Sequence, residues 1–302
     1  MKKNCGSKSG LKASLTIFTL LSFDIMDVTP IISANDLLTL NSGSYVLIDA
    51  SFGKANFEKK HLRGALHVDL NADLSDIKEN AANGGRHPLP SPDAFCSLLS
   101  KLGIEPEDHV LVYDDKNGAN AAARFWWMMR AIGHQKVQVL DGGLAAAEAA
   151  GFPLETGIGP VPKSTTYPAK NWNLPLSNIQ EVERVSQNPN YLVIDVRENF
   201  RYRGESEPID LVAGHIPGSV NVPYFSNLDE KGLYLPAEQL KTKYAELVGG
   251  KKAENIIVHC GSGVTACHTL LAFAQAGMDI PKLYVGSWSE WSRNEKTIAK
   301  EI

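Results

Sequence analysis

The sequence is poor in cysteine. Its four cysteines (Cys5, Cys96, Cys260 and Cys267) are too few and too scattered along 302 residues to build a disulfide framework. No two of them form a C-x-x-C pair, so a structural zinc site is not expected, and no metal or organic cofactor is predicted. This cysteine usage favours a reducing, cytoplasmic compartment.

Long basic runs and long apolar runs are also missing. With 30 Lys and Arg against 34 Asp and Glu, the net charge is −4, which argues against a nucleic-acid partner. The apolar run at residues 15–23 is well short of the ~18 residues of a membrane span, so no stable membrane association is expected. A secretory signal in residues 1–25 is the less favoured alternative, because no small-residue cleavage site follows the run. Met26 is the favoured start.

What remains is an ordinary globular composition, with 43% hydrophobic and 21% charged residues, which excludes wholesale disorder. A chain of 302 residues predicts two domains. Segments of the first half recur in the same order about 150 residues later, which indicates a duplicated domain rather than a short solenoid repeat. The matching pairs are 45–49 with 191–195, 61–65 with 215–219, and 110–114 with 256–260.

Within each half, short β-branched runs alternate with helical stretches. Strands are expected at 47–49, 110–113, 137–140, 192–195, 256–259 and 283–285, and helices at 94–102, 119–131 and 264–276. This alternation predicts an α/β fold in which each domain is a parallel sheet flanked by helices on both faces. A proline- and glycine-rich linker at 156–176 separates a first domain (29–155, after an extension at 1–28) from a second domain (177–302).

The most informative segment is the loop that begins at Cys260. A buried strand delivers this cysteine to a glycine-rich turn, and a helix starts directly afterwards, so backbone N–H groups and a helix N-terminus point at the sulfur. Such surroundings favour the reactive thiolate. A structural cysteine needs neither the glycines nor the hydroxyl side chains that follow, so Cys260 is predicted to be a nucleophile, whereas Cys96 and Cys267 are predicted to be structural. The loop continues as Gly261, Ser262, Gly263, Val264 and Thr265.

Several chemistries that use such a loop are excluded by single positions. A cysteine-dependent phosphatase needs an arginine six residues after the cysteine, where this chain has Ala266. A phosphate-binding loop of the G-x-x-x-x-G-K-[ST] type is absent, and Gly263 stands where a thioredoxin-like site has its second cysteine. The loop instead fits a cysteine that accepts a sulfur atom as a persulfide and passes it to a thiophilic acceptor.

With these residues in view, positions 30–293 resemble the tandem-domain rhodanese-family sulfurtransferases. The motifs that carry the resemblance are CGSGVTACH at 260–268, GHIPGS at 214–219, GSWSEW at 286–291 and DVR at 195–197. The resemblance implies two rhodanese-like domains, of which the first is a catalytically inactive copy. Asp114 stands in that copy where the second half has Cys260, and a carboxylate does not accept sulfur.

The residues after the cysteine resemble those of the 3-mercaptopyruvate sulfurtransferase type (CGSGVT), whereas thiosulfate-using members carry CRKGVT. The resemblance therefore implies 3-mercaptopyruvate as the sulfur donor, with thiosulfate as the alternative. Arg201 matches the first of two donor-binding arginines. The second has no counterpart because residues 205–210 are short and acidic, and Arg203 and Arg86 are the candidates to replace it.

The same group uses a serine–histidine–acid relay, which the resemblance carries to Ser262 and His87. The acid position corresponds to Asn71, so either Asp69 or Asp73 is the alternative partner of His87, or the relay lacks its acid and His87 only orients the donor. The loop residues Gly261, Gly263, Val264 and Thr265 complete the expected donor site. The implied acceptor is cyanide, a thiol or a thioredoxin-like protein, and the rival hypothesis is a non-catalytic sulfur-carrier or anion-sensing module.

Overall fold

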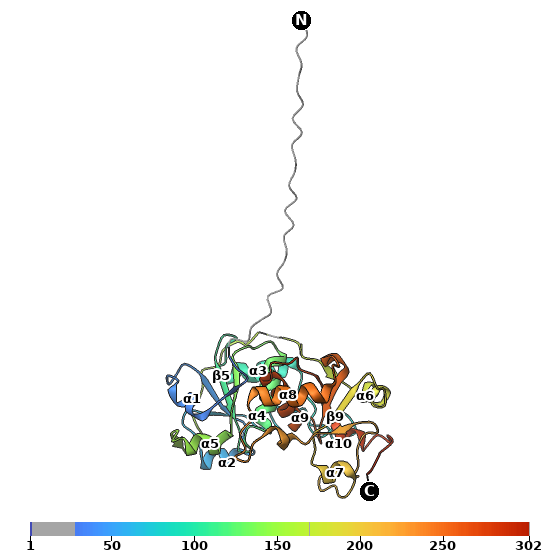
Figure 1. Ribbon diagram of the computed structural model, residues 1–302. Coiled ribbons are helices and arrows are strands. Elements are labelled where there is room, and N and C mark those ends of the chain that lie inside the picture. Colours follow the sequence, from blue (N-terminus) through green and yellow to red (C-terminus); the bar gives the residue numbers. More distant parts are fainter. Residues whose placement is uncertain (2–27, 169, 302) are drawn as a thin grey trace.

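The computed structural model describes residue 1, residues 28–168 and residues 170–301. The expectations for a signal in residues 1–25 and for a start at Met26 therefore concern residues outside the described part, Met1 apart. Two five-stranded sheets, each wholly parallel, dominate the described chain (Figure 1). Among the described helices, none has the length and apolar character needed to cross a membrane.

The two sheets share one strand order. The first runs β1 (Ile31–Ile32), β6 (Val137–Leu140), β5 (Val110–Tyr113), β2 (Val46–Asp49) and β4 (Leu66–His67). The second runs β8 (Leu176–Ser177), β12 (Lys282–Tyr284), β11 (Ile256–His259), β9 (Leu192–Asp195) and β10 (Val220–Asn221). In this order β11 corresponds to β5, as the sequence alignment of the two halves predicts. The short strands β3 (His61–Leu62) and β7 (Leu154–Glu155) pair antiparallel beside the first sheet.

Helices cover both faces of each sheet, so the predicted α/β fold is confirmed. The first domain contains α1 (Ala34–Thr39), α2 (Lys54–Lys59), α3 (Pro92–Lys101), α4 (Ala121–Ala131) and α5 (Gly143–Ala149). The second contains α6 (Ile179–Val185), α7 (Asn199–Arg203), α8 (Ala237–Val248), α9 (Thr265–Gln275) and α10 (Ser287–Trp291), with 3₁₀ turns η1 (Tyr224–Asn227) and η2 (Ala253–Asn255). Helix bounds differ from the expected ones by at most two residues, as at α3, which Ser91 caps by accepting the Ala94 N–H.

Alternation along the strands explains why each sheet has two apolar faces. In β5, Val110 and Val112 join a large core that continues into the second domain, whereas Leu111 and Tyr113 join a smaller cluster on the opposite face. The large core contains residues of α4 and α9, including the fully buried Trp126 and Trp127. Because α4 and α9 pack together between the sheets (Figure 1), the loops that precede both helices come close to each other.

The predicted linker at 156–176 is packed on the first domain over much of its length. Tyr167 is buried, and its hydroxyl lies 3.0 Å from Nδ1 of His134. Trp172 packs on the rings of Phe95 and Trp127. The last residue of the linker, Leu176, belongs to β8, where it pairs with Leu283 at the edge of the second sheet.

Candidate active site

Cys260 lies directly after β11, at the carboxyl end of the second sheet, and its side chain is buried. Its N–H donates to the hydroxyl of Ser287 at 3.2 Å, and its carbonyl accepts the N–H of Trp288 at 3.0 Å. The next carbonyl, that of Gly261, accepts the N–H of Ser289 at 2.8 Å. The first turn of α10 therefore holds the cysteine loop in place by its backbone.

Both glycines of the loop are needed for its close packing. Gly263 has φ +73°, and a Cβ built there would lie 2.5 Å from the carbonyl oxygen of Val285. At Gly261 a Cβ would lie 3.0 Å from Nη2 of Arg86 and 3.4 Å from Nη2 of Arg201. A side chain at either position would displace the loop or the two guanidinium groups above it.

The amide N–H groups of residues 261–265 are not used by the hydrogen bonds of the described residues. In the first domain the matching loop shows what such amides bind. There the buried carboxylate of Asp114 accepts the N–H groups of Lys116, Gly118, Asn120 and Ala122 at 2.8–3.0 Å. The amides of the first loop thus bind a carboxylate of the chain itself, whereas the amides of the matching loop after Cys260 remain available to bind an anion.

A cavity of about 270 Å³ opens beside Cys260 and is lined by both domains. It brings together eight of the ten residues predicted for the site. These are Arg86, His87, Arg201, Cys260, Gly261, Ser262, Val264 and Thr265. Lining residues not predicted for the site are Leu70, Asn120, Arg197, Glu198, Ile209 and Tyr224.

Two of the predicted donor-binding residues lie outside the cavity wall. Arg203 does not line the cavity; its half-exposed side chain pairs with Glu205 at 3.3 Å. Two residues apart on α7, Arg201 and Arg203 point in roughly opposite directions, so one of them faces the cavity and the other solvent. Gly263 is also absent from the cavity wall, because it lies against Val285 on the far side of the loop and shapes the turn instead.

The arginines of the cavity are held by carboxylates of the chain itself. Arg201 contacts Glu207 at 2.8 Å, Glu198 at 3.2 Å and Asp210 at 3.5 Å. Arg86, from the first domain, contacts Asp210 at 3.1 Å. The acidic segment that replaces the second arginine of the resembled group thus orients the arginines that are present.

Ser262 and His87 meet across the domain boundary, with the serine hydroxyl 2.8 Å from Nδ1 of His87. No hydrogen bond of the described residues joins His87 to Asn71, Asp69 or Asp73. Asp69 instead accepts the N–H groups of Asn71 and Ala72, and Asp73 accepts the N–H of Asp69. Among the described residues, neither Asp69 nor Asp73 is therefore bonded to the Ser262–His87 pair, which corresponds to the alternative of a relay without its acid.

Burial, reinforced by the positive charges of Arg86 and Arg124, lowers the pKa of His87 to about 4. His87 is thus a neutral imidazole at pH 7, and it gains a proton only as the pH falls toward 4. Because an unfolded histidine takes up its proton near pH 6.5, this burial also reduces the stability of the folded state progressively below that pH.

A ¹H–¹³C NMR titration tests this directly. The His87 ring signals are expected to stay constant from pH 8 down to about 5 and to shift only near pH 4. Loss of the signal in His87→Gln assigns the resonance. A midpoint near 6.5 would contradict the burial of a neutral ring.

Arg124 is a residue of the site region that the sequence did not reveal. It lies on α4 of the first domain, is fully buried, and donates to the carbonyl of Gly263 at 3.1 Å and to the carbonyl of His87 at 3.1 Å. One guanidinium thus ties the cysteine loop of one domain to the histidine loop of the other. In the sequence it stands in an apolar helix that predicts only core packing.

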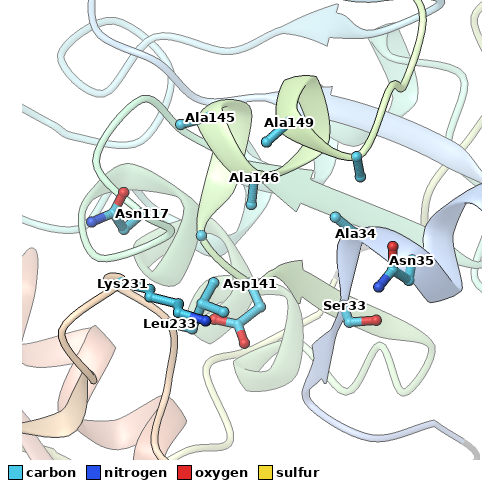
Figure 2. Close-up of a pocket in the computed structure, with 12 residues that line it drawn as sticks. Ser33, Ala34, Asn35, Asn117, Asp141, Ala145, Ala146, Ala149, Lys231 and Leu233 are labelled. Atoms are coloured by element: carbon cyan, nitrogen blue, oxygen red, sulfur yellow. The ribbon is translucent and has the colours of Figure 1, made fainter.

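A second cavity, of about 480 Å³, lies where α1 and α5 face residues 231–233 of the second domain (Figure 2). Five of its twelve lining residues are alanines, and Asp141 and Lys231 are among the polar ones. It contains neither a cysteine nor a histidine. Of these two cavities, the one beside Cys260 therefore holds the cysteine and the histidine predicted for the site.

Comparisons with known proteins agree with this geometry. The rhodanese-like domain family matches residues 33–150 and again 178–294. The chain is 40% identical to the "Probable 3-mercaptopyruvate sulfurtransferase" of Pseudomonas aeruginosa, covering 86% of this chain and 90% of that protein. It is 34% identical to "Thiosulfate/3-mercaptopyruvate sulfurtransferase 2" of Arabidopsis thaliana, covering 85% and 80%. The crystal structure of SseA from Escherichia coli, titled as a 3-mercaptopyruvate sulfotransferase, superposes with a TM-score of 0.71 at 32% identity and covers 87% of this chain and all of that one.

Proposed function

Since the chain belongs to the rhodanese-like family and is a sulfurtransferase, we propose that it moves a sulfur atom from 3-mercaptopyruvate to a thiophilic acceptor through a persulfide on Cys260. The observation that carries this proposal is the single cavity in which Cys260, the Ser262–His87 pair and the guanidinium groups of Arg86 and Arg201 converge. We further propose that residues 177–302 form the catalytic domain and residues 29–155 the inactive one.

In the first half-reaction the thiolate of Cys260 attacks the sulfur of the donor. A sulfur–sulfur bond forms, the carbon–sulfur bond of the donor breaks, and its electron pair leaves on carbon as the enolate of pyruvate. The unused amides of residues 261–265 and the N-terminus of α9 stabilise the negative sulfur before and after transfer. This step needs no oxidant or reductant beyond the donor itself.

The proton and the charge of the donor need partners as well. We assign the donor carboxylate to Arg201 and Arg86, whose Nη2 atoms lie above Gly261. The neutral His87, bonded to Ser262, is placed to take up the proton of the donor sulfur and to return it to the enolate carbon, which yields pyruvate. Without an acid behind it, His87 acts as an isolated neutral base rather than as part of a triad.

In the second half-reaction the acceptor removes the outer sulfur and restores the Cys260 thiolate. Cyanide would leave as thiocyanate, whereas a small thiol or a thioredoxin-like dithiol would leave as a persulfide. We place the enzyme in a reducing, cytoplasmic compartment, because the described cysteines, Cys96, Cys260 and Cys267, are free thiols.

The test is a comparison of two donors with one acceptor. With cyanide as the acceptor, kcat/KM for 3-mercaptopyruvate is expected to exceed kcat/KM for thiosulfate by about tenfold or more. The reason is that carboxylates of the chain already pair with Arg201, which leaves little positive charge to attract the second negative charge of thiosulfate. A preference for thiosulfate would replace the proposed donor. A sulfur adduct on Cys260 with no turnover of either donor would favour the carrier module.

A further inference from the structure

We propose that Asp210 is a specificity-determining residue that selects sulfur donors with one negative charge over donors with two. The inference rests on the proposed function and concerns the same cavity. The side-chain carboxylate of Asp210 is fully buried and contacts three arginines from separate parts of the chain. Oδ1 lies 3.1 Å from Nε of Arg86 and 3.0 Å from Nη1 of Arg293, and Oδ2 lies 3.5 Å from Nη2 of Arg201.

Asp210 lies beside the guanidinium groups that face the donor. A Cβ on Gly261 would lie 3.6 Å from Oδ2 of Asp210, slightly farther than from Arg86 and Arg201. The carboxylate itself does not line the cavity, whereas both arginines do. Its Oδ2 lies 3.5 Å from Nη2 of Arg86 and 3.5 Å from Nη2 of Arg201, the atoms assigned to the donor carboxylate, so Asp210 reduces the positive charge that these groups present to the donor.

The charges joined by ion pairs balance once Asp210 is included, and Arg124, which donates to the carbonyls of Gly263 and His87, adds one further positive charge. The ion pairs of the described residues join four guanidinium groups, those of Arg86, Arg197, Arg201 and Arg293, to four carboxylates, those of Asp195, Glu198, Glu207 and Asp210. With the ion pairs balanced, attraction for an anionic donor comes from the one positive charge of Arg124, the donor-facing N–H groups, the loop amides and the helix N-terminus. These groups attract a single carboxylate. They provide no further positive charge to attract the second negative charge of a dianion such as thiosulfate.

Removing the negative charge of Asp210 is expected to change kcat/KM differently for the two donors. In Asp210→Asn, the cluster gains a net positive charge at an unchanged shape, and the gain acts twice on a dianion but once on a monoanion. With cyanide as the acceptor, the ratio of kcat/KM for thiosulfate to kcat/KM for 3-mercaptopyruvate is expected to rise about tenfold. Glu205→Gln is the matched control, because it removes a carboxylate from the same loop, where Glu205 pairs with Arg203 near solvent; its ratio should stay within about twofold of that of the unmodified chain.

A ratio that does not change in Asp210→Asn, even if both rates fall, would show that Asp210 only braces the arginines and would overturn the proposal. If Asp210→Asn does not fold, Arg293→Gln tests the proposal instead, since it removes the positive charge of an arginine that pairs with Asp210. The ratio must then fall, and an unchanged ratio contradicts the proposal. Failure of the proposed function looks different: neither donor is turned over by the unmodified chain, and Cys260 gains no sulfur from either.

Discussion

Cys260→Ser is expected to lower kcat by about a thousandfold or more with either donor, while leaving the fold unchanged. The serine fits the buried position at the end of β11 and keeps the backbone bonds to Ser287 and Trp288. However, its oxygen does not accept the donor's sulfur, so the first half-reaction cannot begin. Steady-state assays with cyanide and a circular dichroism spectrum of the same sample measure both effects.

Cys96→Ser is the matched control, since it makes the same change at a buried cysteine on α3, in the other domain. It should retain activity within about twofold, after any loss of stability is corrected for by the folded fraction. Activity of Cys260→Ser within about tenfold of the unmodified chain would contradict a sulfur nucleophile at this position.

Asp114→Ala is expected to destabilise the first domain by about 4 kcal/mol. The substitution removes one carboxylate but leaves four amide N–H groups, those that bind Asp114, in a buried loop without their acceptor. Each buried donor left unpaired costs about 1 kcal/mol or more, unless water enters the loop. The measurement is the urea midpoint of the unfolding transition.

Asp115→Ala provides the comparison, because it removes an exposed carboxylate next to Asp114 and should change stability by less than about 0.5 kcal/mol. If Asp114→Ala unfolds at the same urea concentration as Asp115→Ala, the amides do not depend on the carboxylate. The analogy between the two loops would then fail. A ring of amides that needs an anion in the first domain is the reason to expect one that holds an anionic sulfur in the second.

Local sequence predicts the parts of this site that local chemistry builds. The β-branched run before Cys260 and the glycines after it specify a strand, a turn and a helix, and β11 and α9 form there. The comparison of the two halves predicts the correspondence of Asp114 and Cys260, which the matching strand orders reproduce. The strand, the turn and the helix depend on neighbours within a few residues, and the correspondence of Asp114 with Cys260 depends on the order of such segments in each half.

Contacts between distant segments were not predictable in the same way. Asp210 and Arg293 are 83 residues apart, and nothing in either segment indicates that they meet. Arg124 stands in an apolar helix that predicts core packing, and its bonds to the carbonyls of Gly263 and His87 form only because α4 packs on α9. The placement of Arg203 outside the cavity wall was unpredictable for a related reason, because the direction of a side chain on a short helix follows from which face the domain buries.

Intact-protein and peptide mass spectrometry after exposure to 3-mercaptopyruvate, without an acceptor, tests the central claim most directly. The account predicts one added mass of about 32 Da per chain, one sulfur atom, located on Cys260 and removed by cyanide. The same treatment should leave Cys260→Ser unchanged. An unmodified Cys260, or added sulfur found on Cys96 or Cys267 instead, would contradict it.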